Sequence, residues 1–246
     1  MAQITAISFC AYRNYSCHHT SQRMINLQES DAPLQELKVK LPDGFSAKAE
    51  EIYQVVTAIN ETHNLTRITS PEDFKIRHLI DSICSVAFYP ELATESLKIL
   101  DLGCGGGFPC IPLSAYNPNL NITGLDSEGT KVKCVAQAAS ELGLDNLKTI
   151  HARGRELAIK EEHKAQYDIV TARAVATADK LIKECRQFLK PKGRILLYKT
   201  PEAIKKEEKL TLREAKKYKF DIELSPIFTL PNDAGQRQFI VFHSQR

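Results

Sequence analysis

Short apolar runs alternate with helical patterns through the middle of the chain. Five apolar runs predict buried strands, at residues 97–102, 121–125, 147–150, 167–171 and 194–198. Between them, the spacing of apolar residues predicts helices over 131–142 and 177–189, each closed by a Gly or a Pro. Strands that alternate with helices in this way indicate a parallel sheet covered on both faces.

The pattern differs on either side of this region. Apolar residues at helical intervals predict a helix over 47–60, with Ser46 as its cap, and a second helix over 74–88. Toward the other end, 220–230 and 237–242 have no helix between them and predict an antiparallel pair of strands. We therefore expect a doubly wound α/β sheet whose last strand is antiparallel, preceded by a helical element.

Composition limits the class of protein further. Of 246 residues, 43% are hydrophobic and 26% are charged, as in ordinary globular chains, and no apolar run approaches the ~20 residues that a membrane span needs. The seven cysteines are scattered and contain no C-x-x-C pair, so neither a disulfide framework nor a zinc site is expected, and no metal is predicted.

Three segments are expected along the chain. Residues 1–45 form an N-terminal extension that we expect to be poorly ordered, 46–95 form the helical element, and 96–246 form the main domain. The first acidic residue is Glu29, and an acid-free start of this kind is typical of an organellar transit peptide. Without such a signal, the expected location is the cytoplasm.

Charge is unevenly distributed although the net charge is only +3. Residues 180–219 hold 14 Lys or Arg against 5 Glu, which gives +9 there and −6 over the rest of the chain. Such asymmetry indicates a polyanionic partner, and a solvated helix face is the alternative interpretation.

The most specific local signal is a glycine-rich loop that follows the first predicted strand of the main domain and reads Asp101-Leu102-Gly103-Cys104-Gly105-Gly106-Gly107-Phe108-Pro109. Its backbone can approach a ligand closely, and free N–H groups at a helix start favour oxygen atoms. The dinucleotide fingerprint G-x-G-x-x-G fails because Phe108 replaces its third Gly.

The pattern acid-x-Gly-x-Gly-x-Gly is complete in this loop, at Asp101, Gly103, Gly105 and Gly107, and it resembles the first motif of S-adenosylmethionine methyltransferases. A dinucleotide enzyme and a purely structural turn remain alternatives for the loop taken alone. Asp126 ends the next predicted strand, where a carboxylate can accept hydrogen bonds from a ribose diol in either class of enzyme.

Further positions keep a fixed order along the chain from about residue 50 onward. They are Asn64-Leu65-Thr66, Arg77-His78, Asp81-Ser82, the glycine loop with Phe108-Pro109-Cys110-Ile111-Pro112-Leu113, Asp126-Ser127, Arg153, Arg173-Ala174, Lys199 and Arg237. In these residues the chain resembles the small-subunit ribosomal RNA guanine-N7 methyltransferases, the family historically called glucose-inhibited division protein B. The resemblance implies a class I methyltransferase fold over 96–246 and methylation of N7 of a specific guanine in small-subunit (16S-type) ribosomal RNA.

The same resemblance implies a set of site residues. S-adenosylmethionine would be bound by Gly103, Gly105, Gly107, Phe108, Asp126, Ser127, Gly154, Arg155 and Arg173. RNA, alone or in an assembling small subunit, would be bound by Lys131, Arg153, Lys199, Arg237, Arg77 and His78. Arg173 is the predicted catalytic residue, and the protein is expected to act as a monomer without a membrane partner.

Some of these residues have a second interpretation. Arg173 could instead form a surface ion pair with Asp168 or Asp179. His78 lies on an apolar face and could be a core histidine, while Asp101 could anchor the loop through backbone hydrogen bonds. Four positions depart from the family pattern and could alter contacts, namely Cys110, Thr130, Ala172 and Thr200.

The expected methyl transfer needs no proton transfer by the protein. Guanine N7 has an in-plane lone pair and no proton, so it needs no general base. The segment Thr171-Ala172-Arg173-Ala174 lacks the Asn- or Asp-Pro-Pro-aromatic motif of enzymes that methylate amines, and Cys110 lies in the loop, where it is expected to be a small packed residue. A methyltransferase for another RNA or a small molecule, and an inactive ribosome-assembly binder, are the alternatives.

Overall fold

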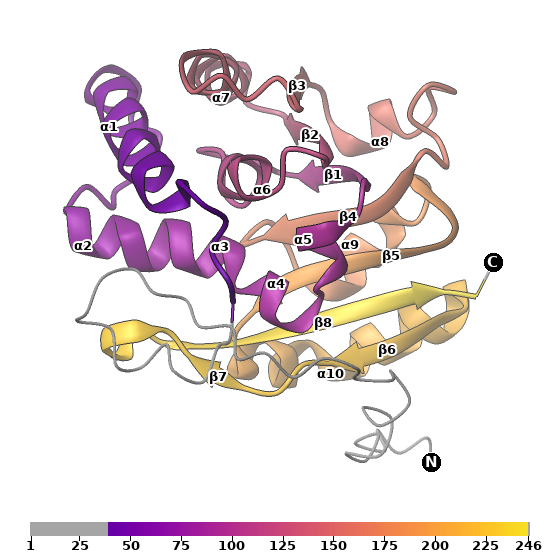
Figure 1. Ribbon diagram of the computed structural model, residues 1–246. Helices are drawn as coiled ribbons and strands as arrows, with labels where there is room; N and C mark the ends of the chain where they lie inside the picture. Colours follow the sequence, from indigo (N-terminus) through magenta and orange to yellow (C-terminus); the bar gives the residue numbers. More distant parts are fainter. Residues whose placement is uncertain (1–38, 246) are drawn as a thin grey trace.

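A computed structural model describes residues 39–245 of the chain. Most of the predicted N-terminal extension therefore lies outside the described residues. The core is one sheet in the order β3-β2-β1-β4-β5-β8-β6, with β7 paired to β8 (Figure 1). The strands are β1 (Lys98–Leu102), β2 (Asn121–Asp126), β3 (Leu147–His151), β4 (Tyr167–Arg173), β5 (Leu189–Lys199), β6 (Phe220–Leu224), β7 (Phe228–Thr229) and β8 (Gln236–Ser244).

Helices cover this sheet. They are α1 (Phe45–His63), α2 (Pro71–Phe74), η3 (Lys75–Ile80), α3 (Asp81–Ile83), α4 (Ser85–Phe88), α5 (Glu91–Thr94), α6 (Cys110–Tyr116), α7 (Gly129–Glu141), α8 (Gly154–Leu157), α9 (Ala178–Cys185), α10 (Pro201–Tyr218) and η4 (Pro231–Asp233). Among the described helices, none has the length and apolar character that crossing a bilayer requires.

The strand directions confirm the predicted architecture. β1 to β5 pair in parallel, whereas β8 lies between β5 and β6 and is antiparallel to both. The parallel strands end in register, since Leu102 pairs with Leu125. The loops that follow β1, β2 and β4 therefore meet at one edge of the sheet, where open α/β folds bind ligands.

Each face of the sheet has its own hydrophobic core. On one face, α1, α6, α7 and the helical segment 71–94 pack together, with Ile52, Phe74 and Ile80 fully buried (Figure 1). On the other face, α8, α9 and α10 pack on the sheet through residues such as Leu157 and Ile182. Because the N-terminal helices share a core with α6, they are held firmly beside the glycine loop that precedes α6.

The N-terminal helices differ in detail from the prediction. Helix α1 begins at Phe45, and Gly44 precedes it with φ +77°, so the prediction of Ser46 as cap was wrong. The predicted helix over 74–88 starts earlier, at Pro71, and is broken into short segments with one π-helical part, η3. Ser70 caps its start, because its Oγ accepts a hydrogen bond from the N–H of Asp73 at 3.2 Å.

Three boundaries toward the C-terminus were also predicted incorrectly. The helix predicted over 177–189 ends at Cys185, and β5 begins at Leu189 instead of residue 194. The apolar run 220–230 forms two strands, β6 and β7, because Pro226 lies between them and has no N–H to donate to the sheet. Both strands nevertheless pair antiparallel with β8, as the prediction of an antiparallel end required.

Candidate cofactor and RNA site

A cavity of about 520 Å³ opens at the carboxyl ends of β1, β2 and β4. Its volume is in the range of small-molecule sites. The lining residues come from the ends of β1, β2 and β4, from the loops after β1 to β4, and from the helices α7, α8 and α9: Leu102, Gly103, Gly105, Leu125, Asp126, Ser127, Lys131, Ala152, Arg153, Gly154, Arg155, Arg173, Ala174, Val175 and Glu184.

The glycine loop forms one wall of this cavity. Gly103 and Gly105 have φ of +72° and +55°, in the left-handed region that L side chains rarely adopt. A Cβ on Gly103 would also lie 2.6 Å from a methyl of Val175, whereas a Cβ on Gly105 would have only one atom within 4 Å. The loop backbone at Gly105 is therefore open to a ligand, which fits the amino-acid end of S-adenosylmethionine.

Asp126 fixes the loop from the end of β2. Its Oδ2 accepts a hydrogen bond from the N–H of Gly105 at 2.8 Å, and its Oδ1 accepts one from the N–H of Glu128 at 2.9 Å. Each carboxylate oxygen has a second lone pair, so the group can still accept from a ribose diol. This geometry fits the sugar of the cofactor.

Asp101 lies behind the loop and outside the cavity lining. It is 1% exposed, and its Oδ1 accepts a hydrogen bond from Thr171 Oγ1 at 2.8 Å across β1 and β4. Burial raises the pKa of this carboxyl to about 6, an effect that the bond from Thr171 and the charge of Arg173 oppose. Asp101 thus anchors the strand end through Thr171 on β4 and through the side chain and backbone of Cys110 after the loop.

Arg173 ends β4 at the cavity wall. Its Nη1 donates to Asp81 Oδ2 and to the carbonyl oxygen of Arg77, both at 2.9 Å, and its guanidinium lies 5.6 Å from the centre of the Phe108 ring. Asp81 also accepts from Arg237 Nε at 2.8 Å through its other oxygen. The partner is therefore Asp81, and neither Asp168 nor Asp179, which the sequence had suggested.

His78 is packed beneath this group. Its ring stacks on Phe108, with centroids 4.1 Å apart and planes 5° apart, and Nε2 lies 2.7 Å from Thr66 Oγ1. Burial and the positive charge of Arg173 lower the pKa of His78 to about 3, so the ring is neutral at physiological pH. His78 is 7% exposed, which places it in the core behind the site.

The cavity brings together many of the residues singled out from the sequence. Gly103, Gly105, Asp126, Ser127, Gly154, Arg155 and Arg173, expected at the cofactor, line it, as do Lys131 and Arg153, expected at RNA. Gly107, Phe108, Arg77, His78, Lys199 and Arg237 do not line it. Of these six, Arg77 is exposed, whereas Phe108 is 5% exposed and lies under the loop.

Lys199 is engaged by the protein itself. Its Nζ donates to the carbonyl oxygen of Ala176 at 2.8 Å and to both carboxylate oxygens of Glu207, and its side chain is 11% exposed. Glu207 Oε2 also accepts from the N–H of Ala178 at the start of α9. This pair joins β5, α10 and the loop after β4.

The four departures from the family pattern leave the cavity lining unobstructed. Cys110 is fully buried, and Ala172 is 2% exposed within β4. Thr200 caps α10, since its Oγ1 accepts from the N–H of Ala203 at 3.2 Å. Thr130 is exposed at the start of α7. Cys110 is the packed residue that the sequence predicted, and a hydrogen bond with Cys104, together with burial, raises the pKa of its thiol.

Sequence reasoning missed three residues of this region. Asp81 was noted only as part of an ordered motif, and Glu184 and Val175 were not singled out. Asp81 is 4% exposed. An acid inside the apolar segment 79–88, four residues after Arg77, is a sequence signal that could have found it, because a buried acid needs a cationic partner. No sequence signal points to Glu184, because its role depends on α9 lying beside α8.

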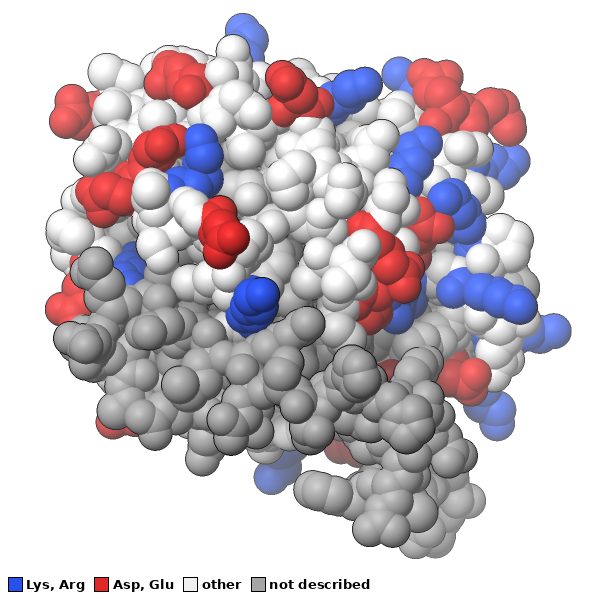
Figure 2. Space-filling view, viewed as in Figure 1, with Lys and Arg blue, Asp and Glu red and all other residues white. Residues whose placement is uncertain are grey.

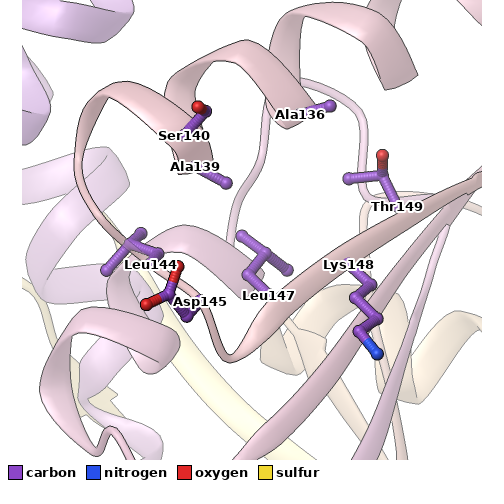
Figure 3. Close-up of a pocket in the computed structure, with 8 residues that line it drawn as sticks. All are labelled: Ala136, Ala139, Ser140, Leu144, Asp145, Leu147, Lys148 and Thr149. Carbon is purple, nitrogen blue, oxygen red and sulfur yellow. The ribbon is translucent and has the colours of Figure 1, made fainter.

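A second hollow, of about 530 Å³, lies between α7 and β3 (Figure 3). Small and apolar side chains form most of its wall, with Asp145 and Lys148 as its charged residues. None of the predicted site residues lines it. Among the described residues, no group of three or more His, Cys, Asp or Glu could hold a metal ion.

The strand order and the loop chemistry define the class. Dinucleotide-binding sheets have the order 3-2-1-4-5-6, and here the match ends at β5, where β8 inserts antiparallel. A SAM-dependent O-methyltransferase from Thermotoga maritima shares the fold, with a TM-score of 0.51 and 20% identity over 77% of this chain and 71% of that one. A SAM-dependent methyltransferase from Aquifex aeolicus matches 76% of this chain and 97% of its own, with a TM-score of 0.50 and 16% identity. The chain therefore has the class I fold of S-adenosylmethionine-dependent methyltransferases.

Sequence comparison identifies the family. The GidB family, described as rRNA small subunit methyltransferase G, matches residues 46–227, and the chain belongs to this family. A ribosomal RNA small subunit methyltransferase G from Staphylococcus saprophyticus is 36% identical over 208 residues, which are 82% of this chain and 83% of that protein. One from Staphylococcus carnosus is 34% identical over 217 residues, 86% of this chain and 88% of that protein.

Proposed function

We propose that the protein transfers a methyl group from S-adenosylmethionine to N7 of a guanine in small-subunit ribosomal RNA. The observation that carries the proposal is the position of Arg173, held by Asp81 at the wall of a cavity that begins at a methyltransferase glycine loop. Family membership supplies the substrate class, since the relatives bear the name ribosomal RNA small subunit methyltransferase G.

In this proposal the glycine loop and Asp126 bind the cofactor. The backbone at Gly103 and Gly105 faces its amino-acid end, Asp126 accepts from the ribose, and Ser127, Gly154 and Arg155 surround the adenosine end. Gly107 and Phe108 support the loop from below, where Phe108 packs on His78. When bound, S-adenosylmethionine supplies a methyl group on a positively charged sulfur, ready for displacement.

The proposed nucleophile has no proton to lose. The described cavity lining holds no His, Cys or Tyr, and its acids are Asp126, which fixes the glycine loop, and Glu184. Guanine N7 attacks through its free lone pair, so the protein has only to align the base and exclude water. Arg173 is placed to donate hydrogen bonds to the guanine edge or to a neighbouring phosphate.

RNA would approach across the cavity mouth. Arg77 and Arg153 are exposed there, and Lys131, Arg237 and the buried His78 complete the proposed set, with His78 acting by packing beneath Arg173. Lys199 holds the loop after β4 through Ala176 and serves RNA binding indirectly. Residues 96–246 would bind the cofactor, and 46–95 would supply the Asp81 that orients Arg173.

The test is methyl transfer to small ribosomal subunits that lack the modification. Purified protein is incubated with methyl-labelled S-adenosylmethionine, the RNA is digested, and the labelled nucleoside is identified. We expect 7-methylguanosine at one site, and a loss of at least ~100-fold in rate for Arg173→Ala. Label in another nucleoside, or no label in any, would overturn the proposed reaction.

Arg194 provides a matched control. It is also a partly buried arginine, paired with Glu91 and lying 5.8 Å from the centre of the Tyr89 ring, but it lies at the opposite end of the strands. Arg194→Ala should lower stability as much as Arg173→Ala while the rate of methyl transfer stays near that of the wild type. Equal losses of rate in both variants would contradict a specific role for Arg173.

The protein is further proposed to act as a monomer in the cytoplasm, where small ribosomal subunits assemble, or in an organelle if the acid-free start is a transit peptide. Size-exclusion chromatography with light scattering tests the first point. Microscopy of the tagged full chain tests the second.

A further inference from the structure

Glu184 reaches the cavity from α9, outside the loops that the family pattern marks. Its carboxylate lies directly against Gly154 at the start of α8, so that a Cβ on Gly154 would overlap Glu184 Oε1. The same Cβ would lie 3.0 Å from a methyl of Leu102, which also lines the cavity. The absence of a side chain at Gly154 therefore leaves room for the carboxylate in the cavity wall.

No residue that the structure describes gives Glu184 a hydrogen bond or an ion pair. The other acid of the cavity, Asp126, has an N–H donor on each oxygen. Glu184 is partly exposed in the cavity wall, so a ligand that fills the cavity displaces water from its carboxylate and must supply a donor in place of that water. Glu184 is thus an acceptor without a donor inside a ligand cavity.

Its place in the cavity indicates the donor. The glycine loop lies at one end of the cavity, and Asp126 follows at the end of β2. Beyond Asp126, Gly154 begins α8 after β3, and Glu184 of α9 lies against it. A cofactor whose amino-acid end meets the loop and whose ribose meets Asp126 places its purine ring at this third position. The purine of S-adenosylmethionine carries an exocyclic amine, which is a hydrogen-bond donor at its outer edge.

We propose that Glu184 is a specificity-determining residue that accepts a hydrogen bond from the exocyclic amine of the cofactor's adenine. This inference rests on the proposed use of S-adenosylmethionine. The carboxylate would reject a 6-oxo purine, because that ring presents a carbonyl oxygen at the same position and two acceptors then face each other.

Binding of two product analogues tests the inference. S-Adenosylhomocysteine carries the amine, and S-inosylhomocysteine carries a carbonyl oxygen in its place. Isothermal titration of the full-length protein should show that the wild type binds the adenosine compound ~10 to 100-fold more tightly, the range for one hydrogen bond to a charged group. Glu184→Gln should reduce this preference at least ~10-fold, because the amide can also donate to the carbonyl.

Glu156→Gln is the matched control, since Glu156 is an exposed acid on α8 outside the cavity lining. It should retain the wild-type preference. A role for Glu184 in folding alone, or a pairing with Arg153 or Arg155, would change the affinity for both compounds equally and would overturn the inference. Equal binding of both compounds by the wild type would overturn it without any variant. Failure of the wild type to bind either compound would refute the proposed cofactor as well.

Discussion

At the scale of the residue, His78 and Asp101 respond to pH in opposite ways. Burial and Arg173 lower the pKa of His78 to about 3, whereas burial raises that of Asp101 to about 6. In the unfolded chain, His78 takes up a proton below about pH 6.5, whereas in the folded protein it stays neutral. Its contribution to stability is therefore lost as the pH falls. Asp101 takes up its proton more readily in the folded protein. Between about pH 6 and pH 4, its contribution to stability therefore grows as the pH falls. The two effects oppose each other over this range.

Removing the histidine should therefore expose the effect of the acid. Between pH 7.5 and pH 5, we expect His78→Gln to lose less stability than the wild type, by about 2 kcal/mol, since the wild type loses up to ~1.4 kcal/mol per pH unit below 6.5 from this group. Urea unfolding at both pH values measures the difference. His63→Gln, at the exposed end of α1, serves as control and should follow the wild type. If His78→Gln lost as much stability as the wild type and His63→Gln, His78 would be protonated at pH 5 in the folded protein, which would contradict its lowered pKa.

At the scale of the element, the pair of Lys199 and Glu207 joins β5, α10 and the start of α9. Lys199→Met should lower the free energy of unfolding by ~3 kcal/mol, because it leaves Glu207 partly buried without its cation. Adding Glu207→Gln should recover part of this loss, since the amide can still accept from Ala178. Chemical denaturation of both variants measures the two values.

The same variant distinguishes positioning from RNA contact. If Lys199 only positions the loop after β4, Lys199→Met should leave the salt dependence of RNA binding unchanged. A decrease of about one in the slope of log K against log salt would instead show that Lys199 neutralises a phosphate.

The elements themselves were largely predictable because burial dictates them. Alternating apolar runs marked β1 to β4 and the antiparallel end, since each strand must bury apolar side chains to join the sheet. Boundaries failed where local geometry outweighed periodicity, as at Gly44, whose left-handed backbone starts α1 one residue before Ser46. The π-helical part η3 has no apolar signature that distinguishes it from an α-helix.

The site was predictable only in part. The glycine loop and Asp126 could be located because their spacing along the chain is short and fixed by a strand-loop-helix unit. Arg173 could be named, but its partner could not, because Asp81 is 92 residues away and meets it only through packing of the helical segment on the sheet. Glu184 was missed for the same reason.

At the scale of the whole molecule, the basic run predicted over 180–219 is partly neutralised. Lys183, Lys190, Arg194 and Lys199 pair with acids, whereas Lys205, Lys206, Lys216 and Lys217 are exposed on α10. On the face shown in Figure 2, acidic and basic side chains are interspersed. The exposed lysines of α10 therefore remain as the part of the run that could bind a polyanion.

Charge reversal tests this electrostatic contribution. Replacing Lys205 and Lys206 with Glu should weaken RNA binding and reduce its salt slope by about two, because two phosphate contacts would be lost. Lys133 and Lys148 are the matched pair, exposed at α7 and β3 on the opposite edge of the sheet. Filter binding over a range of salt compares the pairs. The same salt slope of RNA binding in the wild type and in both double variants would show that Lys205 and Lys206 of α10 do not contact RNA.

The position of β8 has a consequence for how the protein is made. This strand is translated after β6 and β7, yet it lies between β5 and β6 and contributes side chains to both cores, Phe239 to one and Phe242 to the other. Until it leaves the ribosome, the nascent chain has an open β5 edge and two incomplete cores. The methyltransferase domain therefore completes its fold only after nearly all of it has been synthesised, and the unfinished sheet is the form that needs protection from aggregation by chaperones.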